Sequence, residues 1–245
     1  MKKKFLVIIP VRLKSKRLPN KPLLDFQGIP MIMATAINCS KVINRKNIII
    51  ATDSEKIKSL CIKYGFNYMI TSKNCLTGTD RVVEVANKIK REIYINLQGD
   101  EPVFPKSDIK KFVNLAISKN KLICNGYCFI RDKKSYFSKN VPKVIFNKKN
   151  ELLYMSRSPV PGNKYGLFKK AYRQVCIYSF PRNKLILLKR NKKKTPFEEI
   201  EDIEILRFLE LGEKVHMIKL SSDSISVDTL PDYIKAQKVY KKMNK

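Results

Sequence analysis

Three basic side chains near the start of the chain are spaced to surround a polyphosphate. Arg12, Arg17 and Lys21 lie four to five residues apart, and through residue 24 the chain carries eight basic residues and no acidic one. Cations in such a loop can bind a triphosphate and stabilise the negative charge that moves onto a leaving pyrophosphate. A solvated basic loop is the alternative. The pattern G-x-x-x-x-G-K-[ST] is absent, which excludes a Walker-type NTPase.

Two aspartates could supply ligands for a metal ion. Asp100 follows the apolar stretch IYINL at 93–97, which we expect to be a central strand, and Asp228 ends the stretch ISVD at 225–228. In nucleotidyl transfer, Mg²⁺ is commonly held by one or two carboxylates together with phosphate oxygens. Alternatively, Asp100 caps a turn and Asp228 caps the helix that we expect to begin near residue 231.

Further charged residues in the second half could face a second substrate. Arg157 follows an expected strand, and its planar guanidinium could bind a substrate carboxylate through two parallel hydrogen bonds. A surface ion pair is the alternative. Glu198, Glu201, Asp202 and Glu204 crowd one expected helix, where like charges three or four residues apart repel each other. Some of them should therefore face cations or substrate hydroxyls, unless they form a solvated acidic face.

The elements that must position these side chains alternate between strand-like and helical patterns in the first half. This alternation predicts a largely parallel sheet, and ligands of such sheets bind beyond the carboxyl ends of the strands. The basic loop and Asp100 should therefore face the same cleft. The expected strands are 5–10, 47–52 and 93–97, and the expected helices are 30–39, 55–64, 79–91 and 107–118.

From about residue 122 the pattern becomes richer in strands. We predict an α/β fold with a Rossmann-like, mostly parallel central sheet flanked by helices, and a smaller strand-rich subdomain at about 122–180 within one nucleotidyltransferase domain, 1–245. Residues 147–150 should form a hairpin loop. The expected strands are 122–130, 141–147, 151–155, 175–180, 214–220 and 225–228; the expected helices are 197–211, with Phe197, Ile200, Ile203, Leu206 and Leu209 facing inward, and 231–243.

The net charge of +30, from 51 Lys and Arg against 21 Asp and Glu, has two explanations. Dense positive charge could serve a phosphate-rich partner such as nucleic acid. A compositional bias is the other explanation, because Lys, Ile and Asn are abundant while Gly, Trp and His are scarce. Lysine pairs are scattered along the chain without interleaved aromatic residues, which favours the bias. We therefore expect no nucleic-acid partner and keep a basic nucleic-acid-binding protein as a remote alternative.

The cysteines and the first apolar run indicate a soluble protein. The six cysteines form no C-x-x-C and lie far in sequence from the single His216, so we expect reduced thiols, as in a cytoplasm, and no zinc site. The apolar run at 5–11 is short, contains Pro10 and lacks a small-residue cleavage site. No uncharged apolar run approaches the roughly 20 residues that a membrane span needs. We expect a cytoplasmic protein without membrane insertion.

Taken in order, several short motifs resemble one enzyme family. The chain opens with V-I-I-P-V-R-x-x-S-x-R-L-P-x-K-P-L at 7–23, and the further segments are ATD at 51–53, TGTDR at 77–81, NLQGDEP at 96–102, LYMSR at 153–157, PFEEIEDIEILR at 196–207 and VDT at 227–229. Together they resemble the CMP-Kdo synthetases (3-deoxy-manno-octulosonate cytidylyltransferases). Sialic-acid-activating enzymes share only the general form of the opening segment.

The resemblance implies an activity and a set of site residues. It implies a cytidylyltransferase that uses CTP, Mg²⁺ and an acidic sugar, most simply 3-deoxy-manno-octulosonate (Kdo), for lipopolysaccharide or a related surface glycan, and a homodimer formed through 125–180. The implied catalytic residues are Arg12, Arg17, Lys21, Asp100 and Asp228, the last two as metal ligands; the implied nucleotide contacts are Pro10, Val11, Arg12, Lys21, Thr77, Gly78, Thr79, Arg81 and Gln98; the implied sugar contacts are Gln98, Arg157, Gln174, Tyr178, Glu201 and Glu204.

The chain departs from the family pattern in the part expected to face the sugar. Family members usually carry His-Ile-Gly or His-Leu-Gly, whereas this chain has Gln174 for the histidine and Cys176 for the glycine. Glutamine keeps a hydrogen-bond donor and acceptor but cannot titrate near neutral pH. We therefore expect altered sugar selectivity, with a sialic-acid-like sugar or an amino-octulosonate as the alternative acceptor. The segments expected to bind the nucleotide match the family pattern well.

Overall fold

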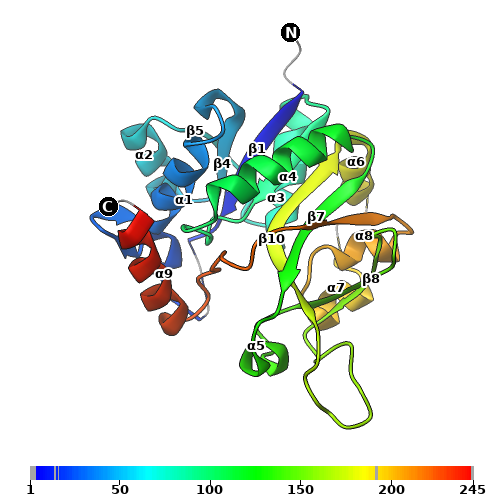
Figure 1. Cartoon of the computed structure of the whole chain (residues 1–245). Helices are drawn as coiled ribbons and strands as arrows, with labels where there is room; N and C mark the ends of the chain where they lie inside the picture. Colours follow the sequence, from blue (N-terminus) through cyan, green and yellow to red (C-terminus); the bar gives the residue numbers. More distant parts are fainter. Residues whose placement is uncertain (1–3, 14, 16, 191–192, 244–245) are drawn as a thin grey trace.

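A mainly parallel sheet of nine strands forms the centre of the molecule (Figure 1). The computed structural model describes residues 4–13, 15, 17–190 and 193–243, so Lys2, Lys3, Lys14 and Lys16 of the basic N-terminal stretch lie outside the described residues. The strands are β1 (Phe5–Val11), β4 (Ile48–Thr52), β5 (Asn67–Ile70), β6 (Ile93–Leu97), β7 (Ile123–Phe129), β8 (Lys143–Phe146), β9 (Leu152–Ser156), β10 (Tyr172–Pro181) and β11 (Val215–Lys219).

The order of the strands is β11-β7-β10-β6-β1-β4-β5, with β8 and β9 attached through β10. Strand β1 is parallel to β4 and β6, and β5 is parallel to β4. Strand β10 runs antiparallel to its three partners, β6, β7 and β8. Every residue of β4 and β6 is buried, as expected for parallel strands covered on both faces. The predicted parallel sheet flanked by helices is confirmed.

Helices cover both faces of the sheet because alternate residues of each central strand point to opposite sides. Val7 and Ile9 of β1 belong to one apolar core, and Leu6 and Ile8 belong to the other. The first core includes residues from α1 (Met31–Ser40), α2 (Glu55–Tyr64) and α4 (Lys106–Ser118); the second includes residues from α3 (Gly78–Lys88), α6 (Arg182–Arg190) and α8 (Leu206–Glu210) (Figure 1).

The last helix, α9 (Leu230–Met243), packs on the segment that follows β1. Its Tyr233 and Tyr240 contact the ring of Phe26 edge-on, in the short hairpin of β2 (Asp25–Phe26) and β3 (Ile29–Pro30). The chain entering α9 passes the carboxyl end of β6, where the Val227 amide donates to the Asp100 carbonyl at 3.0 Å. This packing brings Asp228 next to Asp100 and to the basic loop, although the two aspartates lie far apart in sequence.

The predicted helix 197–211 is wrong in one respect: it is two helices, α7 (Pro196–Glu201) and α8, separated at Asp202. Asp202 has φ 49° and ψ 49°, the left-handed conformation that ends α7. Because of this break, Phe197 and Ile200 are 51% and 78% exposed instead of facing inward. Their counterparts Ile203 and Leu206 are buried as predicted.

Two further differences concern short or irregular segments. Residues 225–228, predicted as a strand, have no regular secondary structure, although Val227 is fully buried. The predicted hairpin at 147–150 is confirmed, with Asn150 at φ 58° in the turn between β8 and β9. The 157–171 segment extends away from the sheet (Figure 1) and carries the exposed Tyr165 and Leu167. The sequence gives no clear pattern for β5, α6 or α5 (Lys133–Phe137).

The free cysteines agree with the expectation of reduced thiols. All six cysteines are free thiols, four of them buried, while Cys75 and Cys176 are partly exposed. Among the described residues, no helix has the length and apolar character required to cross a bilayer.

Candidate active site

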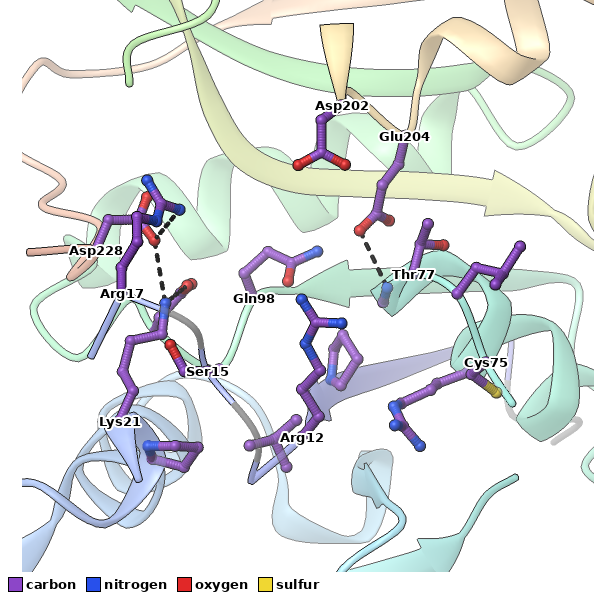
Figure 2. Close-up of a pocket in the computed structure, with 18 of the residues that line it drawn as sticks. Arg12, Ser15, Arg17, Lys21, Cys75, Thr77, Gln98, Asp202, Glu204 and Asp228 are labelled. Carbon is purple, nitrogen blue, oxygen red and sulfur yellow. Dashed lines mark hydrogen bonds and ion pairs between the residues drawn. The ribbon is translucent and has the colours of Figure 1, made fainter. Parts of the chain in front are cut away.

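A cavity of about 630 Å³ lies beyond the carboxyl ends of β1 and β6 (Figure 2). This is the position where open α/β sheets bind ligands. The structure brings most of the predicted site residues into its wall: Pro10, Val11, Arg12, Arg17, Lys21, Thr77, Gly78, Arg81, Gln98, Asp100, Arg157, Glu204 and Asp228. Four do not line it, namely Thr79, Gln174, Tyr178 and Glu201.

Gly99 allows the two strand ends to meet at the base of this cavity. A Cβ at this position would lie 3.0 Å from the Pro10 carbonyl oxygen and 3.0 Å from Ile32 Cδ1. Real Cβ atoms rarely come so close to backbone, so a side chain here would push β1 and β6 apart. The glycine of the QGDEP segment is therefore needed for the approach of Asp100 to the basic loop.

The two aspartates and the basic loop meet at one ammonium group. Lys21 Nζ donates to Asp100 Oδ2 at 2.6 Å and to Asp228 Oδ1 at 3.1 Å. Arg17 Nη2 donates to the same Asp228 oxygen at 3.0 Å (Figure 2). The alternative that Asp228 caps α9 is wrong, because Thr229 and Asp232 form that cap with each other. Both carboxylates point toward the cavity.

The electrostatics keep Lys21 charged. Burial of its ammonium favours the neutral amine, but the attraction of Asp100 and Asp228 outweighs this and raises the pKa of Lys21. The side chain is 15% exposed, and those of Asp100 and Asp228 are 23% and 26% exposed. Partial burial makes each of these interactions stronger than a surface ion pair.

Arg12 differs from the other basic residues of the cavity. Its side chain is exposed and reaches into the middle of the cavity, between Lys21 and Thr77 (Figure 2). Among the described residues it has no hydrogen-bond or ion-pair partner. Its guanidinium donors are therefore open to a ligand, whereas Arg17 and Lys21 already neutralise aspartates.

The start of α3 is held by an internal carboxylate. Glu204 accepts from the Gly78 amide at 3.0 Å, from the Thr79 amide at 2.8 Å and from Thr79 Oγ1 at 2.5 Å. Burial raises the pKa of Glu204, although these donors oppose the rise. Glu204, expected to contact the sugar, thus fills the helix N-terminus that a phosphate would otherwise prefer.

Arg81 is also committed to the fold. It is 3% exposed and donates to Thr71 Oγ1 at 2.5 Å, to the Ser72 carbonyl at 3.2 Å and to Asp53 Oδ2 at 2.9 Å. It therefore fixes the 71–72 segment to the end of β4. Part of its side chain still lines the cavity, next to Thr77.

Arg157 is held by backbone groups and not by the surface ion pair that the sequence allowed. Its Nε donates to the Glu201 carbonyl at 2.5 Å and its Nη2 to the Asp202 carbonyl at 3.0 Å. The Glu201 carboxylate accepts from Ser156 Oγ at 2.6 Å and from the Arg157 amide at 2.7 Å. Glu201 therefore connects the end of β9 to α7 and positions Arg157.

The remaining predicted sugar contacts lie inside the protein. Gln174 is 6% exposed, and its Nε2 donates to Asn125 Oδ1 at 3.1 Å. Tyr178 is 5% exposed, and its ring stacks on Phe180 with centroids 6.0 Å apart. Neither side chain belongs to the cavity wall. Gln174 therefore supports the pairing of β7 with β10, behind the cavity.

Several residues that line the cavity were missing from the predicted site, although Asp202 was named within the acidic helix. Asp202 turns a 74% exposed carboxylate toward it, and Asn140 Oδ1 accepts from Arg17 Nη1 at 3.2 Å. The crowding of acidic residues at 198–204 was the only sequence signal for Asp202, and no local pattern indicates Asn140. Ser15 and the exposed Lys139 also line the cavity.

The aspartate pair has the chemistry of a magnesium site. Mg²⁺ prefers oxygen ligands and usually keeps several waters, so one or two carboxylates plus substrate phosphates suffice. Asp100 and Asp228 provide two hard oxygen donors that already share one cation. Within the described part of the chain, no group of three or more His, Cys, Asp or Glu residues could hold a metal ion. A closed all-protein metal cage is therefore not part of this site.

Fold and cavity together define a nucleotidyltransferase of the α/β type: a basic loop after the first strand meets two aspartates in the wall of a cavity at the strand ends. A family model described as cytidylyltransferase matches residues 6–215. The chain belongs to the cytidylyltransferase family.

Curated relatives carry a more specific name. The 3-deoxy-manno-octulosonate cytidylyltransferase of Francisella tularensis subsp. holarctica is 35% identical over 248 residues, which cover 96% of this chain and 97% of the relative. The enzyme of the same name from a Nitratiruptor species is 37% identical over 237 residues, covering 93% of this chain and 96% of the relative.

Solved structures agree with the fold. A structure of CMP:2-keto-3-deoxy-manno-octonic acid synthetase complexed with CTP matches with a TM-score of 0.88 and 28% identity, covering 98% of this chain and all of the other. The inositol-1-phosphate CTP transferase of T. maritima matches with a TM-score of 0.67 at 15% identity, which shows a shared fold alone.

Proposed function

We propose that the protein transfers the cytidylyl group of CTP to 3-deoxy-manno-octulosonate, giving CMP-Kdo and pyrophosphate. The observation that carries this proposal is the convergence of Arg12, Arg17 and Lys21 with Asp100 and Asp228 on one cavity. The names of relatives that match almost the whole chain support the choice of substrates. The product would serve lipopolysaccharide or a related surface glycan, and the enzyme would act in the cytoplasm.

The basic loop accounts for the phosphate chemistry. The anomeric hydroxyl oxygen bonds to the α-phosphorus, the bond from that phosphorus to the pyrophosphate oxygen breaks, and the hydroxyl proton is released. Negative charge then grows on the pyrophosphate. Arg12, with its donors open to the cavity, would stabilise this charge, and Arg17 and Lys21, which line the same cavity, would assist.

Mg²⁺ is the proposed cofactor, held by Asp100 and Asp228. When bound, the ion neutralises phosphate charge and polarises the α-phosphate. The two carboxylates act from separate segments: one follows β6 and the other precedes α9. Because the Val227 amide donates to the Asp100 carbonyl, the backbone fixes their separation.

The acceptor sugar would lie on the side of the cavity formed by Gln98, Arg157 and Asp202. Arg157 and Gln98 are the proposed direct contacts, and Glu201 and Glu204 are proposed to act by holding Arg157 and α3. Thr79, Gln174 and Tyr178 would shape this side from behind. The homodimer through 125–180 is part of the proposal, supported by the exposed apolar side chains of Leu153, Tyr165 and Leu167 within that range.

Another acid sugar is the second candidate acceptor, favoured by Gln174 and Cys176 in place of the family's His and Gly. A pyrophosphate-release assay over a panel of acid sugars, with CTP and UTP compared, separates the two. The proposal expects turnover with CTP and Kdo and little with UTP. Turnover of a nonulosonate or an amino-octulosonate with none of Kdo would reject Kdo as the substrate.

A further inference from the structure

Lys21 occupies the gap between the two aspartates. Its ammonium lies within 2.6 Å of Asp100 Oδ2 and 3.1 Å of Asp228 Oδ1, and the side chain is largely buried. This ammonium, together with Arg17 at Asp228, balances two carboxylates that would otherwise repel each other. We propose that Lys21 is an internal stand-in for the divalent cation and leaves the gap when the metal–nucleotide complex binds.

The ammonium and a divalent ion cannot use these oxygens together. Mg²⁺ binds carboxylate oxygens at about 2.0–2.1 Å, and an ammonium hydrogen-bonded to the same oxygens would lie within a few ångströms of it. Two positive centres at that distance, partly screened from water, repel each other strongly. Lys21 must therefore release Asp100 Oδ2 and Asp228 Oδ1 before these two oxygens can bind a metal ion.

The local structure allows the side chain to move while the backbone stays in place. Lys21 begins the short 3₁₀ helix η1 (Lys21–Leu23), its amide donates to the Leu18 carbonyl at 3.1 Å, and Pro22 beside it is buried. Its flexible four-carbon stem carries a compact charge that can rotate to a new partner. The triphosphate, bound in the cavity that Lys21 lines, offers that partner.

This arrangement couples the metal to the nucleotide. Without nucleotide, the metal must displace Lys21 from two aspartates and leave it without a partner, so binding is weak. With nucleotide, the displaced ammonium pairs with a phosphate oxygen, so binding of each ligand favours the other. The chain therefore avoids holding a metal in the empty site. This inference rests on the proposed nucleotidyl transfer and on the aspartates as metal ligands.

The test measures Mn²⁺ binding in the absence of nucleotide, by electron paramagnetic resonance titration of free Mn²⁺. The Lys21→Met variant should bind Mn²⁺ at least about tenfold more tightly than the unaltered chain, because the internal competitor is gone. Lys139→Met is the matched control: this lysine lines the same cavity and is exposed, and its ammonium donates to no aspartate among the described residues. Its affinity should change less than about twofold, which measures the effect of charge alone.

A second measurement guards against a simple folding defect. In EDTA, Lys21→Met should melt at a lower temperature than the unaltered chain, because the aspartates repel each other, and saturating Mn²⁺ should restore most of the loss. Equal affinity of the Lys21→Met and Lys139→Met variants for Mn²⁺ would overturn the inference. If the two variants bind Mn²⁺ equally but the unaltered chain turns over CTP and Kdo, the proposed function stands. In that case only the stand-in role of Lys21 is rejected.

Discussion

Arg12 is a cation whose donors are open to the cavity, whereas its neighbours are already engaged. Arg17 and Lys21 neutralise Asp228 and Asp100, and Arg81 fixes the 71–72 segment. At the scale of single residues, the cavity therefore separates side chains that await a ligand from side chains that hold the site together. The two groups should respond differently to substitution.

Arg12→Gln should remove activity without affecting the fold. Removal of one preorganised donor from a developing charge typically lowers kcat by about 10²–10³-fold, and we expect a loss of that size. Because Arg12 makes no hydrogen bond or ion pair among the described residues, the melting temperature should stay within about 1 °C. Steady-state kinetics and differential scanning calorimetry measure the two effects. A clear fall in melting temperature would show that Arg12 supports the fold instead.

Glu101 should make stability depend on pH. Burial, and then the neighbouring Asp100, raise the pKa of Glu101 to about 8. Between pH 4.5 and 8 the folded chain keeps a proton that the unfolded chain has lost, so the stability contributed by this group falls as pH rises through that window. The slope is about 1.4 kcal/mol per pH unit. Above the folded pKa no further loss follows from this group.

Substitution of Glu101 isolates this effect. Glu101→Gln should flatten the fall of the unfolding free energy between about pH 5 and pH 8 relative to the unaltered chain. Urea unfolding at intervals of one pH unit, without metal or nucleotide, measures the difference between the two profiles. Parallel profiles would show that the buried carboxyl titrates alike in the folded and unfolded chains.

At the scale of elements, the start of α3 is fixed by a chain of charged groups from α7 and α8. Arg207 of α8 is 1% exposed; it donates to both Glu198 carboxylate oxygens, at 2.5 and 2.6 Å, and to Asp80 Oδ1 at 2.8 Å. Asp80 in turn accepts from the Thr77 amide at 2.8 Å. The acidic helix that sequence alone could read as a solvated face is thus partly an internal support of the cavity wall.

Arg207→Met should destabilise the protein strongly. It leaves the fully buried Glu198 carboxylate without its partner, and breaking a buried pair from one side costs about 3–5 kcal/mol. The double variant Glu198→Gln with Arg207→Met should lose clearly less than the sum of the two single variants, because neither charge remains unpaired. Urea unfolding gives these free energies. Strict additivity would contradict the coupling.

Much of the fold, but less of the site, could be predicted from the residues. The α2 and β6 bounds match the predicted 55–64 and 93–97, because strong periodicity and apolar runs are local signals. The break at Asp202 was missed because neither Gly nor Pro marks it. The edge strand β5 is largely exposed and lacks an apolar run. Pairing of Lys21 with Asp228 depends on packing across most of the chain, which no local pattern encodes.

At the scale of the whole molecule, the charge of +30 has an explanation without a nucleic-acid partner, whose absence stays a prediction. The basic residues that line the cavity have partners or positions suited to a triphosphate, and the rest follow the compositional bias.

The exposed apolar residues have a different meaning. Leu153 of β9 and Phe197 and Ile200 of α7 are 58%, 51% and 78% exposed, and the Tyr154 ring contacts Phe197. Such a set is suited to the proposed contact between two copies.

Ile200→Asp should weaken that contact. A charge at the most exposed of these apolar positions should shift the protein from dimer to monomer, with little change in the melting of the isolated chain. Light scattering after size-exclusion chromatography measures the mass. Ile62→Asp is a matched control, because Ile62 is 61% exposed on α2, outside this surface. A monomeric unaltered chain would contradict the proposed dimer, and a dimer that persists in the Ile200→Asp variant would show that α7 lies outside the contact.

The central claim is that cations and aspartates converge on one triphosphate–metal assembly. The most direct test measures pyrophosphate release from CTP and Kdo with Mg²⁺. It compares the unaltered chain with the Asp100→Asn and Asp228→Asn variants. We predict turnover by the unaltered chain and a loss of at least about 10²-fold in each variant, with the fold retained by circular dichroism. Pyrophosphate release by both folded variants at the unaltered rate would show that the two carboxylates do not serve the reaction, and would contradict the account.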